Sequence, residues 1–390
     1  MISVDDALTQ IFKLIRPVPS ETIRLEDADG RVLSIPAVAK RDQPPFAASA
    51  MDGYAICKQD ASTGAKLKII GQSAAGHGFS GQVAPGQCVR IFTGAPLPNG
   101  ADLVVIQEDV ARQGETIALQ GLPEKSGHVR PAGGDFCAGE QLVAPRLLGP
   151  SDLSLLASMN VATLTVARRP VVALIATGDE LVMSGETPNS DQIIASNSFG
   201  LAAMARRVGA QPRILPIARD NATSLEYAFS LAKGADLVVT IGGASVGDHD
   251  IVADVVKSIG IKPAFHKIAM RPGKPLMAGK FGNAIHLGLP GNPVSSLVCG
   301  HIFMLPALRA MQGLLAEPAP RHGAVLTQDI SSNGPREHYM RARVTNGEIT
   351  VFDKQDSALL GVMSQANALL VRPVDDRARK KGAQVTYVSI

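Results

Sequence analysis

The sequence predicts a multidomain chain of mixed α+β and α/β class, organised around a central α/β domain with a parallel sheet. Three observations support this prediction. The chain has 390 residues, 45% of them hydrophobic, which is enough apolar material for several cores. Strand-like and helix-like segments alternate regularly over residues 169–317. Glycine- and proline-rich stretches with short apolar runs, typical of β domains, lie on either side.

The N-terminal segment, residues 1–20, has the pattern of an amphipathic helix. Ser3 is a suitable N-cap, and Pro17 stands where such a helix should end. The segment lacks the basic start and continuous apolar core of a signal peptide. Its apolar residues recur at the spacing of one helical face: Leu8, Ile11, Phe12 and Ile15.

Residues 21–140 have the pattern of an all-β domain. Alternating runs such as "KLKIIG", "QCVRIF" and "ADLVVIQEDV" are separated by turn-forming residues. Residues 141–168 become helical again in "PSDLSLLASMNV". We therefore expect residues 1–20 and 141–168 to form one helical linker domain, interrupted by the inserted β domain.

Residues 169–317 alternate apolar strands, such as "VVALIAT" and "ADLVVTIGG", with helical segments. Strands that are apolar along their whole length are typical of a parallel sheet covered by helices on both faces. Residues 318–390 return to a β pattern, with an Asn346-Gly347 hairpin signal. They predict a small C-terminal β-barrel.

Charge and cysteine content exclude several classes of function. Lys and Arg total 38 against 35 acidic residues, so the net charge of +3 does not indicate a nucleic-acid-coating protein. No apolar run approaches the length of a membrane span, and we expect no membrane partner. The sequence has neither a P-loop nor a G-x-S-x-G elbow. The four cysteines are scattered without a CxxC pair, which favours a reducing, cytoplasmic location: Cys57, Cys88, Cys137 and Cys299.

Three unusual loops of the central region each follow a predicted strand. They are "TGDE" (177–180), "GGASVGDHD" (242–250) and "PGNP" (290–293). Ligands of open parallel sheets bind in the crevice beyond the carboxyl ends of the strands. We therefore expect the three loops to surround one crevice.

The residue types in these loops suit an anionic ligand held with a cation. Gly242 and Gly243 allow a phosphate to approach the backbone near a helix N-terminus, and Ser245 adds a hydroxyl. Carboxylates would repel a phosphate unless a cation such as Mg²⁺ lies between them. The alternative is that this loop makes only a turn and a helix cap. The candidate metal ligands are Glu180, Asp248 and Asp250.

A cationic turn follows in "KIAMRPGKP". Lys267, Arg271 and Lys274 are candidate anion contacts, with Arg271 and Lys274 held by the Pro-Gly turn between them. The alternative is a solvated surface turn.

Six ordered motifs resemble those of one family. They are "SAMDGYA" (49–55), "RIFTGAPLPNGADLVV" (90–105), "TGDEL" (177–181), "GGASVGDHD", "RPGKP" and "LPGNPVSS". Together they resemble the MoeA-type molybdopterin molybdenumtransferases, relatives of the C-terminal domain of gephyrin, over essentially the whole chain. The resemblance implies four structural domains in an elongated homodimer, with a central molybdopterin-binding domain similar to the MoaB and MogA proteins. It implies insertion of molybdate into adenylylated molybdopterin, with Mg²⁺ and release of AMP.

The resemblance also implies roles for individual residues. Asp220 would join the acidic crevice, Ser245 would lie beside the adenylate, and Pro290 and Pro293 would shape the third loop. Arg341 or Arg343, with Ser364, resemble an oxyanion-binding pair. Three further residues would complete the site from the partner subunit: Asp52, Thr93 and Asp135. By composition alone, "Met-Asp-Gly" around Asp52 is equally a simple turn.

The resemblance implies two kinds of protein partner besides a second copy of the chain. These are the molybdopterin adenylyltransferase and downstream maturation proteins of molybdoenzymes. Two other functions remain open from the sequence: a nucleotide pyrophosphatase that uses the same α/β domain, and a cofactor carrier or scaffold without catalytic activity.

Overall fold

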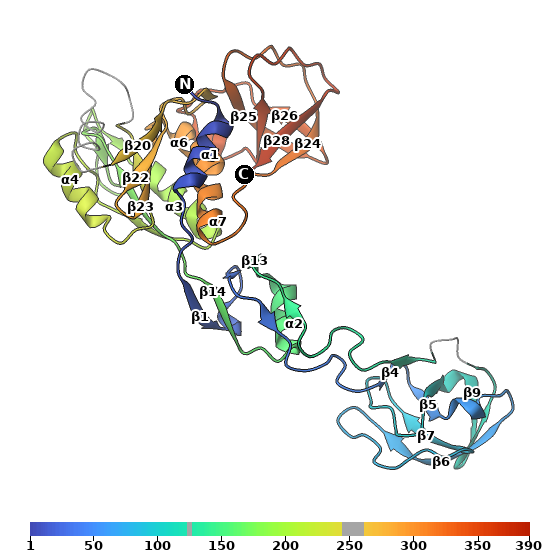
Figure 1. Cartoon of the computed structure of the whole chain (residues 1–390). Helices are drawn as coiled ribbons and strands as arrows, with labels where there is room; N and C mark the ends of the chain where they lie inside the picture. Colours follow the sequence, from blue (N-terminus) through green and yellow to red (C-terminus); the bar gives the residue numbers. More distant parts are fainter. Residues whose placement is uncertain (123–126, 244–260) are drawn as a thin grey trace.

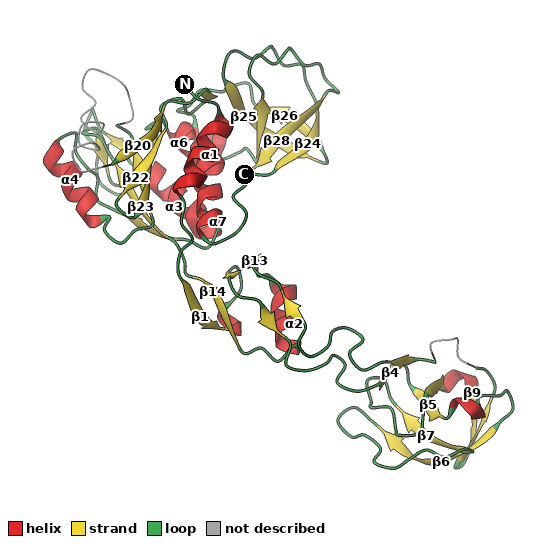
Figure 2. Cartoon of the chain, in the orientation of Figure 1, coloured by secondary structure: helices red, strands yellow, loops and turns green. Residues whose placement is uncertain are grey.

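The computed structural model describes residues 1–122, 127–243 and 261–390. The chain is elongated (Figure 1). The α/β domain and the C-terminal barrel lie side by side at one end, a small mixed unit lies in the middle, and a β domain forms the other end. The described helices gather mainly in the α/β domain (Figure 2).

The α/β domain has a six-stranded sheet in the order β18-β15-β19-β23-β22-β20. The first four strands pair in parallel, as predicted, and the last two pair antiparallel. Strands β15 and β19 are buried along nearly their whole length, which explains their uninterrupted apolar sequence. The strands are β15 (Val171–Ala176), β18 (Gln211–Ile214), β19 (Leu237–Ile241), β20 (Lys262–His266), β22 (Met277–Phe281) and β23 (Ala284–Leu289).

Helices cover both faces of this sheet because alternate strand residues point to opposite sides. Leu174 and Val239 pack with α1, α3, α6 and α7, whereas Ile175 and Val238 pack with α4. The helices are α1 (Val4–Leu14), α3 (Asn197–Arg207), α4 (Ala222–Leu231), α6 (Pro293–Cys299) and α7 (Leu305–Met311), with a π-helical turn, Gly300–Met304, joining the last two.

The N-terminal helix α1 forms as predicted, but it packs against the α/β domain and not in a linker domain. Ser3 caps it and exchanges hydrogen bonds with Asp6. Its buried face, which includes Leu8 and Ile11, packs into the core of the α/β domain. The prediction that residues 1–20 and 141–168 form one helical linker domain is therefore wrong. An amphipathic stripe requires an apolar partner, and here the α/β core supplies it.

The middle unit is built from two stretches of chain that flank the β domain. Its sheet has the order β1-β14-β2-β13, and α2 (Pro150–Ser158) packs against it. The unit thus takes residues 21–39 from the stretch predicted as β domain. Its strands are β1 (Ser20–Arg24), β2 (Val32–Leu33), β13 (Arg146–Leu147) and β14 (Thr163–Ala167), with the separate pair β3 (Ala37–Val38) and β12 (Gln141–Leu142).

The β domain has a six-stranded sheet in the order β8-β5-β7-β6-β10-β9 and a two-stranded pair, β4-β11. Its core is small and aliphatic, with Ile56, Ile117 and Leu119 among the buried residues. The strands are β4 (Ala48–Ser49), β5 (Gly53–Ile56), β6 (Lys66–Ser73), β7 (Gln87–Ile91), β8 (Leu103–Ile106), β9 (Val110–Gln113), β10 (Thr116–Leu119) and β11 (Val129–Arg130).

The C-terminal domain is a closed five-stranded barrel, as predicted. Its strands follow the order β25-β26-β24-β28-β27, and β27 pairs back onto β25 to close the ring. The predicted hairpin turn is present, with Asn346 and Gly347 both at positive φ. The strands are β24 (Arg321–Leu326), β25 (Glu337–Thr345), β26 (Glu348–Val351), β27 (Ala368–Arg372) and β28 (Gln384–Ser389), with the short helix α8 (Leu360–Met363) before β27.

One stretch of the described chain departs from the expectation of no span-length apolar segment. The continuous helix Pro293–Met311 is long and apolar enough to cross a membrane by composition. In the fold, however, 78% of its most apolar window is buried. Its position in the α/β core accounts for its composition.

Candidate active site

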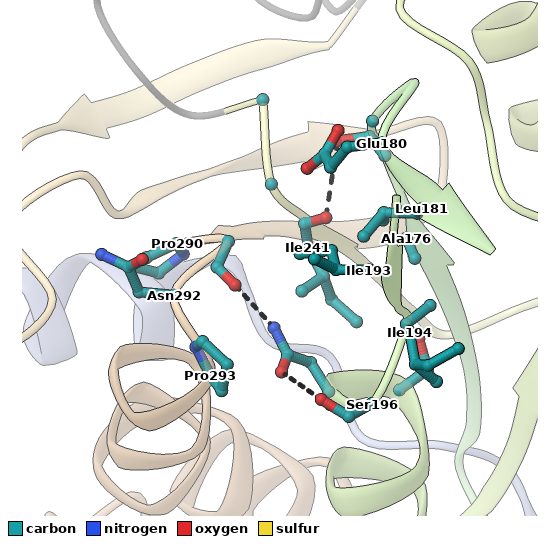
Figure 3. Close-up of a pocket in the computed structure, with 18 of the residues that line it drawn as sticks. Ala176, Glu180, Leu181, Ile193, Ile194, Ser196, Ile241, Pro290, Asn292 and Pro293 are labelled. Carbon is teal, nitrogen blue, oxygen red and sulfur yellow. Dashed lines mark hydrogen bonds between the residues drawn. The ribbon is translucent and has the colours of Figure 1, made fainter. Parts of the chain in front are cut away.

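The predicted crevice exists. A cavity of about 900 Å³ lies at the carboxyl ends of β15, β19 and β23. All three predicted loops contribute to its lining, through residues 177–180, 242–243 and 290–293. Figure 3 shows Pro290 and Pro293 on one side of the cavity and Leu181 and Ile194 on the other, with Glu180 above. The convergence follows from the topology, because parallel neighbouring strands end at the same edge.

Gly242 lies where three strand ends almost touch. Its φ is +99°, and a Cβ built there would lie 2.7 Å from the carbonyl oxygen of Thr177. Its N–H donates to Leu289, and Gly291 lies close to its Cα on the other side. Only glycine fits this position without strain, so the bare backbone noted in the sequence has a structural cause. Gly243 also has a positive φ, of +61°, and lines the cavity.

Two of the predicted acidic residues, Glu180 and Asp220, line the cavity together with Asp179. Glu180 folds back over the backbone of Gly178, where an added Cβ would meet its carboxylate. Exposed carboxylates at the edge of a cavity are the donor type that Mg²⁺ prefers, so their chemistry suits the predicted cation. Within the described residues, no group of three His, Cys, Asp or Glu is close enough to hold a metal ion. Ser245, Asp248 and Asp250 lie outside the described residues.

Two polar residues near the cavity were missed in the sequence. Asn197, at the first turn of α3, donates from Nδ2 to the carbonyl of Gly291 at 2.8 Å, and this ties the third loop to the helix. Arg219 donates from Nη1 to carbonyl oxygens of the first loop. The only sequence signal was their position: each lies in a segment that borders a strand end. Nothing in their residue type alone distinguishes them from surface residues.

The cationic turn lies next to the cavity, but its charged side chains are not part of the described lining. Pro275 lines the cavity, whereas Lys267, Arg271 and Lys274 do not. Arg271 and Lys274 are exposed, and Lys267 is half-buried with φ of +70°. The turn bridges two domains, because β21 (Met270–Arg271) pairs in parallel with β25 of the barrel.

Arg341 on β25 is a buried cation with spare donors. Its side chain is fully buried, and Nη2 donates to the carbonyls of Lys354 and Asp356. Its Nε and Nη1 have no hydrogen-bond partner among the described residues. Burial, and more weakly the nearby Arg271, lower its pKa. Unpartnered buried donors are costly, and an anion at the junction of the two domains would satisfy them.

Arg343 and Ser364 lie in different surroundings from Arg341. Arg343 is exposed, donates to the carbonyl of Gln365 at 2.9 Å, and lines a separate cavity on the barrel. The Ser364 hydroxyl donates to the carbonyl of Gly361. Of the two arginines left open by the sequence, Arg341 is fully buried with two unpartnered nitrogens among the described residues, whereas Arg343 is exposed.

Asp52 and Thr93 meet in the β domain. The Oδ1 atom of Asp52 accepts from both the N–H and the hydroxyl of Thr93, each at 2.7 Å. These two bonds, with a smaller contribution from Arg90, lower the pKa of Asp52. Asp135 lies on an exposed segment, where its N–H donates to Gln43. Within one chain, this domain lies at the opposite end from the cavity (Figure 1).

Comparison with known proteins accounts for the whole chain. Three family models match consecutive stretches: the MoeA N-terminal region (domain I and II) at residues 2–160, the "Probable molybdopterin binding domain" at 173–310, and the MoeA C-terminal region (domain IV) at 323–390. The molybdopterin molybdenumtransferase of Nostoc sp. is 35% identical over 100% of this chain and 94% of its own length. The chain belongs to the MoeA family. This is a family of transferase enzymes of molybdenum cofactor biosynthesis.

Other MoeA relatives agree with this assignment. The molybdopterin molybdenumtransferase of Haemophilus influenzae is 34% identical over 87% of this chain and 85% of its own length. A crystal structure of the molybdopterin biosynthesis MoeA protein from Pyrococcus horikoshii superposes with a TM-score of 0.88. It covers all of both chains at 25% identity. The elongated arrangement of domains is thus that of a solved MoeA structure.

Proposed function

We propose that the chain inserts molybdate into adenylylated molybdopterin and releases AMP, which yields the molybdenum cofactor. The observation that carries the proposal is the cavity itself. Three loops from parallel strand ends bring bare glycine backbone and carboxylates to one opening in a chain of the MoeA family. This is the combination that a nucleotide phosphate held with a cation requires.

Within the cavity, each loop has a distinct task. The backbone at Gly242 and Gly243 would bind the adenylate phosphate, and Ser245 would add a hydroxyl. Pro290 and Pro293 would hold the opposite wall in one conformation. Glu180, with Asp248 and Asp250, would hold Mg²⁺, and Asp220 completes the acidic side. When bound, Mg²⁺ supplies positive charge at the phosphate oxygens.

The oxyanion would bind beside the cavity, where the α/β domain meets the barrel. Arg341 offers two unpartnered nitrogens there, and Arg271 is close enough to affect its pKa. Lys274 and Lys267 lie on the same cationic turn, and Ser364 lies on the segment after α8. Placing fixed cations between two reacting anions would lower the repulsion that opposes their encounter.

We further propose that the active unit is a homodimer with a shared site. The β domain, which carries Asp52 and Thr93 and is followed directly by Asp135, lies at the opposite end of the elongated chain from the α/β domain (Figure 1). A two-fold related copy could bring these residues to the cavity. The ionised state of Asp52, favoured by Thr93, suits a role in ordering substrate rather than donating a proton. The molybdopterin adenylyltransferase and maturation proteins remain proposed partners, with the reaction in the cytoplasm.

Reconstitution tests the function directly. Purified protein is mixed with adenylylated molybdopterin, Mg²⁺ and molybdate, and AMP release and cofactor formation are followed. AMP release that depends on molybdate supports the transferase. Release that ignores molybdate would indicate a pyrophosphatase, and tight binding of the substrate without release would indicate a carrier.

A further inference from the structure

The two acidic edges of the cavity are joined to each other by hydrogen bonds that run in both directions. The guanidinium of Arg219, in the segment between β18 and α4, reaches across to the first loop. Its Nη1 donates to the carbonyl oxygens of Asp179 at 2.9 Å, Leu181 at 3.0 Å and Gly178 at 3.4 Å. In return, the carboxylate of Asp179 accepts the N–H of Asp220 at 3.1 Å. Each loop therefore holds the other.

These bonds fix the residues that line the cavity. Glu180 lies between the carbonyls that Arg219 gathers, and Asp220 follows Arg219 directly. Arg219 itself is not in the described lining. Its backbone is held by α4, because the N–H of Arg219 donates to the hydroxyl of Ser224 in the first turn of that helix. A half-buried cation that serves three carbonyl oxygens holds a turn more firmly than a neutral side chain can.

We propose that Arg219 is a positioning residue that holds Glu180 and Asp220 at a fixed separation, and so sets the affinity of the cavity for a divalent cation with a nucleotide phosphate. The affinity part rests on the proposed function. The positioning part does not, since it concerns only the two loops. The mechanism is preorganisation: carboxylates already in place lose less conformational freedom when a cation binds.

The chain offers a matched control in Arg213. It lies on β18 in the same domain, and its Nη2 donates to two carbonyls at the end of α4, those of Ala232 and Lys233. Arg213→Gln therefore removes a comparable set of bonds away from the cavity. Arg219→Lys keeps the charge but loses the planar fork, and should rescue the function of Arg219 only in part.

Hydrogen–deuterium exchange of the ligand-free protein tests the positioning. Arg219→Gln should raise exchange about 5- to 10-fold in peptides that cover residues 178–182 and 220, because their bonds open locally. Arg213→Gln should leave those peptides unchanged. Equal exchange in Arg219→Gln and the wild type would overturn the proposal.

Binding of Mn²⁺ in the presence of AMP, followed by electron paramagnetic resonance, tests the affinity. Arg219→Gln should weaken Mn²⁺ binding about 10-fold, the low end of effects for residues that orient metal ligands, with Arg219→Lys intermediate and Arg213→Gln unchanged. Unchanged affinity in Arg219→Gln would overturn this part. If the wild type binds no Mn²⁺ with AMP, the metal–nucleotide function itself fails, and exchange alone decides the positioning role.

Discussion

The cavity of the α/β domain and the Asp52–Thr93 pair of the β domain hold acidic residues in opposite ways. In the cavity, Glu180 and Asp220 come from loops that sheet topology brings together, around an opening large enough for a substrate. In the β domain, the Oδ1 atom of Asp52 already accepts two hydrogen bonds from Thr93, within a surface turn. The first arrangement places carboxylates around a cavity, whereas the second uses a carboxylate to hold a turn. Because the β domain lies at the opposite end of the chain from the cavity, Asp52 can act only on the cavity of another molecule.

We expect the largest loss of activity when one carboxylate from either region is replaced. Glu180→Gln removes a charge at the proposed cation, and we expect molybdate-dependent AMP release to fall about 10²- to 10³-fold. Asp52→Asn should lower it by a similar factor if both residues serve one site. Asp27→Asn, in the exposed 3₁₀ helix Leu25–Asp27 of the middle unit, is the control. Full activity in Asp52→Asn would reduce that residue to a turn former.

Replacing one glycine in each region by alanine should lower the free energy of unfolding by different amounts. Gly242→Ala should cost about 1–3 kcal/mol of unfolding free energy, because both φ and the contact with Thr177 oppose a Cβ. Gly64→Ala in the β domain has φ of +86° but nothing within 4 Å, so it should cost only about 1 kcal/mol. Urea unfolding measures both. An equal loss of unfolding free energy in the two variants would mean that the close contact between Gly242 and Thr177 adds no cost beyond the positive φ.

The oxyanion site can be assigned by thermal unfolding with and without molybdate. At about 100 times its dissociation constant, a bound ion stabilises the wild type by about 2.7 kcal/mol. Arg341→Met should lose most of this. Its ligand-free stability should change by less than about 1 kcal/mol, because removing a buried cation offsets two lost carbonyl bonds. Arg343→Met should keep the stabilisation; the reverse outcome would move the site to Arg343.

The smallest effect concerns the protonation of Asp52. Thr93→Val removes the hydroxyl bond, so the pKa of Asp52 should rise towards its ordinary value. A carboxyl whose pKa is lowered by folding contributes stability above its unfolded pKa and loses it as the pH falls through the folded pKa. The variant should therefore lose the part of that contribution that the hydroxyl bond supplies, while the part from the backbone N–H of Thr93 remains. Carboxyl NMR titration measures this, with the exposed Thr116→Val as control. An unchanged pKa would mean that the backbone N–H bond suffices.

How far the sequence predicts these features depends on the distance between the partners. The cavity was predictable because each loop carries its own signal, such as the paired glycines at 242 and 243, and strand order brings the loops together. The Asp52–Thr93 pair was not predictable from composition, since the two residues are 41 positions apart and only tertiary turns join them. The prediction of where α1 packs was wrong for a related reason. A stripe such as that of Leu8 and Ile11 predicts burial but not the surface that buries it.

The role of Arg219 was also not predictable from the sequence. Its contacts are carbonyl oxygens, which every residue has, so no partner side chain could be recognised in the sequence. Arg341 was suggested only by resemblance, and its unpartnered nitrogens become visible only in the fold. Residues that act through backbone atoms or across a domain junction can therefore be recognised only from the structure.

Complementation between inactive chains tests the central claim, that the two regions form one site across a dimer. Glu180→Gln and Asp52→Asn proteins are mixed, unfolded and refolded together, and molybdate-dependent AMP release is measured. Random pairing makes about half the dimers mixed, each with one intact site, so about a quarter of wild-type activity should return. Activity no higher than that of the separate variants would contradict the shared site.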